Sequence, residues 1–158
     1  MTPILMLGAG RMGGALIEGW SQKGAFTPSD LIIRDPYPSK EAQEAAKAGA
    51  RLNPDDRVLA EAKVLLLAVK PQMWREAAAQ ITDLVAPDCI IVSIAAGVRA
   101  ADISAAFGGR VVARIMPTTA VAVAKGVASI FATDAKALGI SVPPISASVA
   151  WIARSNKP

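Results

Sequence analysis

The sequence predicts an α/β fold in which a doubly wound, mostly parallel sheet forms a single domain, and two patterns lead to this prediction. Short apolar runs recur along the chain without the polar alternation of half-exposed strands, which indicates strands buried on both faces. Longer stretches with apolar residues at helical spacing separate these runs, as in sheets whose parallel strands are joined by helices. A length of 158 residues suits one domain with a real core, and a hydrophobic content of 53 % excludes a disordered chain.

The first half of the chain alternates strand and helix. We expect strands at residues 4–7, 31–33 and 64–69. We expect helices at residues 11–22, 39–48 and 54–60. The helical spacing of Met12, Ala15 and Leu16 predicts the first helix. Gly49 is placed to end the second helix, and Pro54 begins the third.

The second half continues the alternation. Pro71 stands at the first position of a helix that we expect to end near Leu84, before Pro87. A further helix is expected at residues 100–107. The remaining apolar runs predict strands at residues 90–94, 111–115 and 127–131.

The regular alternation ends near residue 133. Two adjacent prolines, Pro143 and Pro144, break helix and central strand alike, and the last 24 residues contain no acid. We therefore expect a domain over residues 1–132 and an unassigned tail over residues 133–158. We expect this tail to be disordered, or to be the product of a frameshift or an early stop in the gene.

Composition excludes several kinds of chemistry. The chain has no His, which removes Ser-His-Asp hydrolysis and His-ligated metals, and the single Cys89 excludes a disulfide framework and a Cys-based zinc site. The net charge of +4 arises mostly after residue 120 and forms no Lys/Arg cluster, so binding to nucleic acid is not expected. No apolar run reaches membrane-spanning length and the start lacks the features of a signal peptide, so we expect a cytoplasmic protein with no membrane contact.

A glycine-rich turn follows the first strand. Gly8-Ala9-Gly10-Arg11-Met12-Gly13 is a G-x-G-x-x-G motif between a strand and a helix, the context in which this motif binds a dinucleotide. Gly8 permits the tight turn, Gly10 lets a pyrophosphate approach the backbone, and Gly13 lets the helix pack close to the sheet. The fold predicted is therefore of the Rossmann type, with NADP or NAD as coenzyme.

The end of the second predicted strand, Arg34-Asp35-Pro36-Tyr37, is expected near the adenosine ribose. Asp35 lies 22 positions after Gly13, near the spacing of an acid that binds the ribose hydroxyls of NAD. The adjacent Arg34 could instead pair with the 2′-phosphate of NADP. These two residues leave the choice between NAD and NADP open, and a solvated loop is the alternative to both.

Two further turns are expected at the same edge of the sheet. They comprise Ala68, Val69, Lys70 and Pro71, and Ala95, Ala96 and Gly97. Small residues there would let the backbone approach a nicotinamide ribose. Lys70 can equally be a solvated loop cation. After the next strand, the hydroxyls of Thr118 and Thr119 could donate to a substrate or to the cofactor, or could cap the loop.

Together these segments resemble the Δ1-pyrroline-5-carboxylate reductase family. The resemblance covers about residues 3 to 132. The motifs that carry it are the segments 7–13, 67–72 (Leu-Ala-Val-Lys-Pro-Gln), 92–98 (Val-Ser-Ile-Ala-Ala-Gly-Val) and 114–119 (Arg-Ile-Met-Pro-Thr-Thr). The resemblance implies that Leu7 to Gly13 hold the pyrophosphate, and that Asp35 and Tyr37 lie near the adenosine. It also implies that Asp56 touches the coenzyme, where the family often has Asn.

The sequence departs from this family in two places. The family motif M-P-N-T-P reads Met116-Pro117-Thr118-Thr119-Ala120 here, which removes an amide and a proline. The family continues into a helical domain that forms the dimer and completes the substrate site, and we expect that domain to be absent from this chain.

The reaction implied is hydride transfer from NAD(P)H to the C=N carbon of 1-pyrroline-5-carboxylate, giving L-proline, with a homo-oligomer as the family's assembly. A protonated imine is already electrophilic, so the lack of His is compatible with it. The alternatives are a catalytically incompetent NAD(P)-binding remnant, or another Rossmann dehydrogenase of the hydroxyacid or F420-linked type. An interaction protein is a further alternative.

Overall fold

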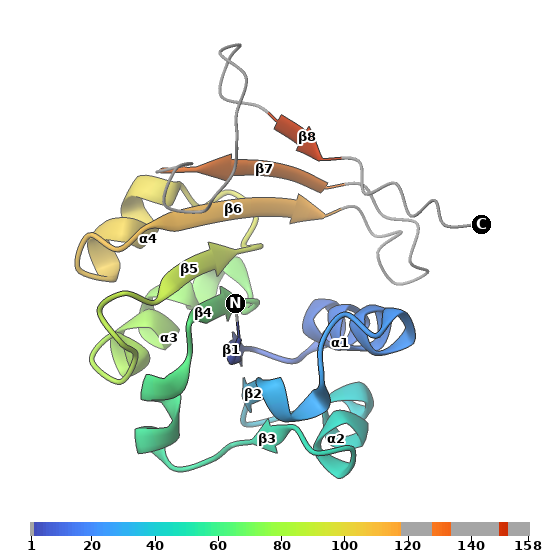
Figure 1. Ribbon diagram of the computed structural model, residues 1–158. Helices are drawn as coiled ribbons and strands as arrows, with labels where there is room; N and C mark the ends of the chain where they lie inside the picture. Colours follow the sequence, from blue (N-terminus) through green and yellow to red (C-terminus); the bar gives the residue numbers. More distant parts are fainter. Residues whose placement is uncertain (1, 118–127, 134–148, 152–158) are drawn as a thin grey trace.

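A computed structural model describes residues 2–117, 128–133 and 149–151 of the chain (Figure 1). The strands in these residues form one eight-stranded sheet in the order β3-β2-β1-β4-β5-β6-β7-β8. The parallel strands are β1 (Ile4–Leu7), β2 (Leu31–Arg34), β3 (Arg51–Leu52), β4 (Val64–Leu67), β5 (Ile90–Ser93) and β6 (Val112–Pro117). The Rossmann-type, doubly wound architecture expected from the sequence is confirmed.

The register brings the carboxyl ends of the central strands to one edge. Leu7 of β1 is opposite both Arg34 of β2 and Leu67 of β4, and Leu67 is in turn opposite Ser93 of β5. The strand order reverses between β1 and β4, because β2 and β3 lie on one side of β1 and the later strands on the other. In open α/β sheets the ligand binds at the carboxyl edge beside such a reversal.

Helices cover both faces of the sheet (Figure 1). The helices α1 (Arg11–Lys23) and α2 (Lys40–Lys47) lie on one face, and α3 (Trp74–Ile81) and α4 (Ala100–Ala106) lie on the other. Alternate residues of β1 enter the two cores: Met6 packs with Ile17 of α1, whereas Leu5 and Leu7 pack in the cluster that holds Ile81 of α3. This is why the strands read as continuous apolar runs.

Two predicted helices differ from those in the structure. The helix expected at residues 54–60 is a 3₁₀ helix, η2 (Asp56–Glu61). The helix expected at residues 71–84 is a 3₁₀ turn, η3 (Pro71–Met73), followed by α3, which ends at Ile81. The Thr82 hydroxyl lies 2.8 Å from the Ala78 carbonyl oxygen and 3.1 Å from that of Ala106. Such side-chain bonding to the backbone competes with continuation of the helix.

The last strands run against the parallel core. β7 (Ala128–Ala132) pairs with β6 in antiparallel register, and β8 (Val149–Trp151) pairs with β7 in the same way. The strand expected at residues 127–131 therefore exists, while β8 lies in the tail that the sequence left unassigned. None of the helices within the described ranges is long and apolar enough to cross a membrane.

Candidate functional site

The turn between β1 and α1 is held tightly between the ends of two neighbouring strands. Gly8 donates its backbone N–H to the Arg34 carbonyl oxygen at 3.0 Å, and Ala68 donates to the Leu7 carbonyl oxygen at 2.8 Å. Gly8 has φ +91°, and a Cβ atom built on it would lie 2.9 Å from the carbonyl carbon and oxygen of Ala68. Glycine is therefore required at position 8 by both its backbone conformation and its neighbours.

The last glycine of the motif brings helix α1 against the sheet. A Cβ on Gly13 would lie 2.6 Å from the Gly8 carbonyl oxygen and 3.3 Å from the sulfur of Met6. The next residue, Gly14, has the same role toward α2, because its Cβ would lie 2.7 Å from Ser39 Oγ and from Glu41 Oε2. Gly14 was not among the residues selected from the sequence, although it directly follows the last glycine of the motif.

Gly10 differs from the other glycines of the turn because it faces open space. A Cβ built on Gly10 would meet no atom within 4 Å, and the residue is exposed. It is the N-cap of α1 and has no side chain, so the first N–H groups of this 13-residue helix receive no side-chain hydrogen bond from position 10. The turn thus offers uncapped amides and the positive end of a helix dipole to an anion such as a pyrophosphate.

Asp35 joins the residue after β2 to the glycine turn. One carboxylate oxygen accepts from the backbone N–H of Ala9, and the other accepts from that of Tyr37 at 2.7 Å. The Asn53 side chain accepts from the Asp35 N–H at 3.0 Å and donates to its carbonyl oxygen at 2.8 Å. Asn53, which has φ +47°, was not among the residues selected from the sequence. Its position in an Asn-Pro pair after β3 is the signal that could have indicated it.

The Arg34 side chain contacts the start of η2 rather than Asp35. Its guanidinium donates to the Pro54 carbonyl oxygen at 2.8 Å and to the Asp56 carboxylate at 2.7 Å. Arg34, Asp35 and Asp56 were all candidates from the sequence, and the structure brings them to one side of the glycine turn. Tyr37, on the same loop, is 88 % exposed.

The turns after β4 and β5 lie at the same edge as the glycine turn. Ala68 and Val69 are half-buried, whereas Lys70 is exposed, and no side-chain hydrogen bond caps the N-terminus of η3. After β5, Ala95 is buried while Ala96 and Gly97 are exposed, Gly97 with φ +73°.

The hydroxyl of Ser93, a fully buried residue, accepts from the Ala95 N–H at 3.2 Å and shapes this second turn. Ser93 stands in a motif that carried the family resemblance, but we did not select it as a site residue. Pro71 begins η3 as expected for a first helical position.

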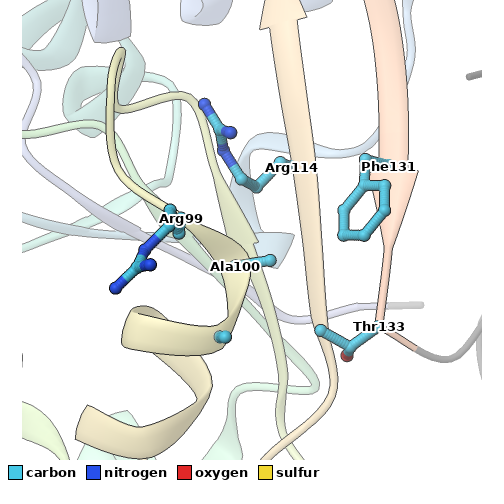
Figure 2. A pocket seen from close by; sticks show the side chains of 6 residues that line it. Arg99, Ala100, Arg114, Phe131 and Thr133 are labelled. Atoms are coloured by element: carbon cyan, nitrogen blue, oxygen red, sulfur yellow. The ribbon is translucent and has the colours of Figure 1, made fainter. Parts of the chain in front are cut away.

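A pocket of about 380 Å³ lies beside the β5 turn, between the start of α4 and strands β6 and β7 (Figure 2). It is lined by Arg99, Ala100, Ala101, Arg114, Phe131 and Thr133. An Nη atom of Arg114 lies 3.5 Å from the Ala95 carbonyl oxygen, whereas Arg99 pairs with Asp102 at 2.9 Å. The substrate candidates Thr118 and Thr119 follow β6 and lie outside the described residues.

Cys89 does not contribute a reactive group to this edge. It is 1 % exposed at the opposite, amino-terminal end of β5, next to Ile90. Burial raises the pKa of its thiol to about 11, and the nearby Arg110 opposes this shift only in part. The thiolate is the nucleophilic form of cysteine, so a thiol with this pKa is unreactive near neutral pH.

Comparisons with known proteins agree with the fold. The family model described as NADP oxidoreductase, coenzyme F420-dependent, matches residues 3–97, more than half of the chain. The chain is 35 % identical over 127 residues to a pyrroline-5-carboxylate reductase of Methanosarcina acetivorans, covering 78 % of this chain and 47 % of the relative. The corresponding enzyme of Escherichia coli is 31 % identical over 126 residues, with the same coverage of both chains.

Solved structures of pyrroline-5-carboxylate reductases share the fold of this chain. The pyrroline-5-carboxylate reductase from Coxiella burnetii superposes with a TM-score of 0.74 at 24 % identity, covering 84 % of this chain and 50 % of that chain. The Plasmodium falciparum pyrroline carboxylate reductase with NADP bound gives a TM-score of 0.71 at 18 % identity, covering 84 % and 48 %. The chain thus spans about half the length of the relatives it matches. It belongs to the NADP oxidoreductase, coenzyme F420-dependent, family, and the relatives reported above are pyrroline-5-carboxylate reductases.

Proposed function

We propose that this chain carries the coenzyme-binding half of a pyrroline-5-carboxylate reductase and takes part in the reduction of 1-pyrroline-5-carboxylate to L-proline. The observation that carries the proposal is the open space at Gly10, placed at the N-terminus of α1 and at the edge where β1 and β4 end side by side. The 31 to 35 % identity to two reductases of that name supports the substrate. The substrate is a small molecule.

The proposed coenzyme contacts follow from the edge geometry. The pyrophosphate lies over the β1–α1 turn, whose residues are Leu7, Gly8, Ala9, Gly10, Arg11, Met12 and Gly13. The adenosine lies toward the loops after β2 and β3, whose residues are Arg34, Asp35, Tyr37 and Asp56. The nicotinamide lies toward the turns after β4 and β5, whose residues are Ala68, Val69, Lys70, Pro71, Ala95, Ala96 and Gly97. Residues 1–132 form the coenzyme domain in this proposal.

The described residues orient and shield the reaction rather than exchange protons. Bound NADH or NADPH supplies the hydride that adds to the carbon of the C=N bond, whose nitrogen is protonated and becomes the ring amine of proline. The exposed backbone at Ala96 and Gly97 lets the nicotinamide ring approach, and the apolar Ala68 and Val69 exclude water on the other side. We propose that Thr118 and Thr119 donate to the substrate carboxylate.

Two measurements on the purified chain test this function. We expect NADH or NADPH fluorescence to change on binding, and we expect oxidation of the bound coenzyme when 1-pyrroline-5-carboxylate is added. Coenzyme binding without oxidation would identify the chain as a binding remnant that needs a further domain or a homo-oligomeric partner. Binding of neither coenzyme would overturn the proposal.

The free thiol of Cys89 fits a reducing compartment, and we propose the cytoplasm.

A further inference from the structure

We infer that this site selects NADH over NADPH, through Asp35 and through the pairing of Arg34 with Asp56. The inference rests on the proposed coenzyme binding and deepens it. The two coenzymes differ by one phosphate on the 2′-oxygen of the adenosine ribose, and in this fold that oxygen lies by the residue after β2. That residue is Asp35.

Asp35 is held with its carboxylate against the glycine turn. Backbone N–H groups of Ala9 and Tyr37 each donate to one of its two oxygens, and Asn53 holds its backbone on both sides. A carboxylate has about four acceptor sites, so two remain for the hydroxyls of a ribose. The same fixed negative charge repels a 2′-phosphate, and the four hydrogen bonds prevent the loop from turning it away.

The cation that could neutralise a 2′-phosphate is already paired. Arg34 has its two terminal nitrogens on Pro54 and Asp56, at 2.8 and 2.7 Å. Strand alternation places Arg34 on the same face as Ile32, which packs with Leu59 of η2, so its side chain leaves the sheet on the side opposite α1 and α2. A 2′-phosphate would have to break this ion pair before it could bind Arg34.

The other cations near these loops do not replace Arg34. Lys40 pairs with Glu44 at 3.5 Å, and Arg57 pairs with Asp55 at 3.1 Å. Arg11 begins α1 beside the proposed pyrophosphate position, which NADH and NADPH share, so its charge favours both coenzymes equally. Within the described residues, we therefore assign the distinction between the two coenzymes to Asp35 and to the Arg34–Asp56 pair.

The test is the dissociation constant of each coenzyme, measured by nicotinamide fluorescence on the purified chain. We expect NADH to bind roughly tenfold or more tightly than NADPH, since one like-charge contact near a protein surface has this magnitude. Displacement by ADP-ribose and by its 2′-phosphorylated form should show the same ratio, which assigns the effect to the 2′-phosphate. NADPH binding as tightly as NADH would overturn the inference while supporting coenzyme binding; binding of neither would overturn both.

Two variants separate the charges involved. Asp56→Asn removes the carboxylate that pairs with Arg34, so the affinity for NADPH relative to that for NADH should rise by about threefold to tenfold. Asp35→Asn removes the negative charge that repels the 2′-phosphate, so it should lower the ratio of NADH affinity to NADPH affinity. Arg11→Gln is the control, and it should weaken both coenzymes by the same factor. A preference that neither Asp35→Asn nor Asp56→Asn alters would overturn the assignment to these residues.

Discussion

The carboxylate of Asp35 accepts a hydrogen bond from the backbone N–H of Ala9, across 26 positions of sequence. The Ala9 carbonyl oxygen in turn accepts from the N–H of Ser39 at 3.1 Å, so the loop after β2 holds both sides of one residue in the glycine turn. Ala9 itself is fully buried. The proposed pyrophosphate and ribose positions are therefore joined by direct hydrogen bonds through Ala9.

Gly8 and Gly10 should respond to alanine in opposite ways. Gly8→Ala places a side chain at φ +91° and 2.9 Å from the backbone of Ala68, so we expect the free energy of unfolding to fall by about 2–4 kcal/mol. Gly10→Ala has room for its Cβ and should cost about 1 kcal/mol or less. Coenzyme affinity of the Gly10→Ala variant should nevertheless fall about tenfold or more, because the methyl group occupies the approach to the pyrophosphate.

Urea unfolding and nicotinamide fluorescence measure these two effects separately. An unfolded Gly10→Ala variant, or one that binds coenzyme like the wild type, would contradict the roles assigned to the two glycines.

Ser93 should stabilise the turn that faces the nicotinamide. Its buried hydroxyl is the acceptor for the Ala95 N–H, and Ser93→Ala leaves that donor without its partner. We expect the variant to lose about 1–3 kcal/mol of unfolding free energy and to bind coenzyme more weakly. Ser104→Ala is a comparison outside the site, because the Ser104 hydroxyl donates to the Arg110 carbonyl oxygen. Its coenzyme affinity should be that of the wild type; equal losses of affinity in both variants would contradict the prediction.

Arg110 should be the largest single polar contribution to the α3–α4 side of the domain. Its guanidinium donates to the carbonyl oxygens of Thr82, Val85, Ala86 and Phe107, at 2.9 to 3.2 Å. Arg110→Ala leaves these carbonyls without their donor and should lower the free energy of unfolding by about 2–3 kcal/mol.

Arg99→Ala is the matched control for this prediction. Arg99 is also an arginine of this region, but its side chain is 81 % exposed and pairs with Asp102, so Arg99→Ala should lower the free energy of unfolding far less than Arg110→Ala does. Thermal or urea unfolding of both variants provides the comparison. Similar losses of unfolding free energy in the two variants would contradict the stabilising role of the carbonyl contacts of Arg110.

Cys89 should make stability depend on pH in the alkaline range. Burial raises the pKa of its thiol from 9.0 to about 11 in the folded chain. The unfolded thiol therefore loses its proton first as pH rises, and the stability present below pH 9 is lost between about pH 9 and pH 11. The loss should be about 2 kcal/mol by pH 11 relative to Cys89→Ala, which removes the titrating group.

Urea midpoints of the wild type and Cys89→Ala at pH 7, 9 and 11 check this dependence, since the two proteins differ only in the Cys89 thiol. A constant difference across that range would contradict the prediction.

Most of the fold was predictable because its strands are continuous apolar runs. The strands β1, β2, β4 and β5 each end within two residues of the predicted bounds. The helix expected at residues 39–48 is also present as α2, with Ser39 as its N-cap, whose hydroxyl accepts from the Ala42 N–H. The short strands were not predictable in this way. β3 has two residues and no apolar run, and β8 has three residues in a segment with no regular pattern. Pairing with a neighbouring strand defines both.

The site was predictable as a set of residues but not as an arrangement. By itself, the sequence determined the glycine turn. Only glycine meets the positive φ of position 8 and the close backbone approach at positions 8 and 13, and strand–turn–helix order places that turn at a binding edge. The partners of the charges, by contrast, were decided only by tertiary structure. Arg34 and Asp35 are adjacent and could have competed for the same ligand, but strand alternation directs Arg34 to Asp56 and the turn after β2 directs Asp35 to Ala9. Which atoms a charge meets depends on loops that are far apart in sequence, and these become neighbours only when the sheet forms.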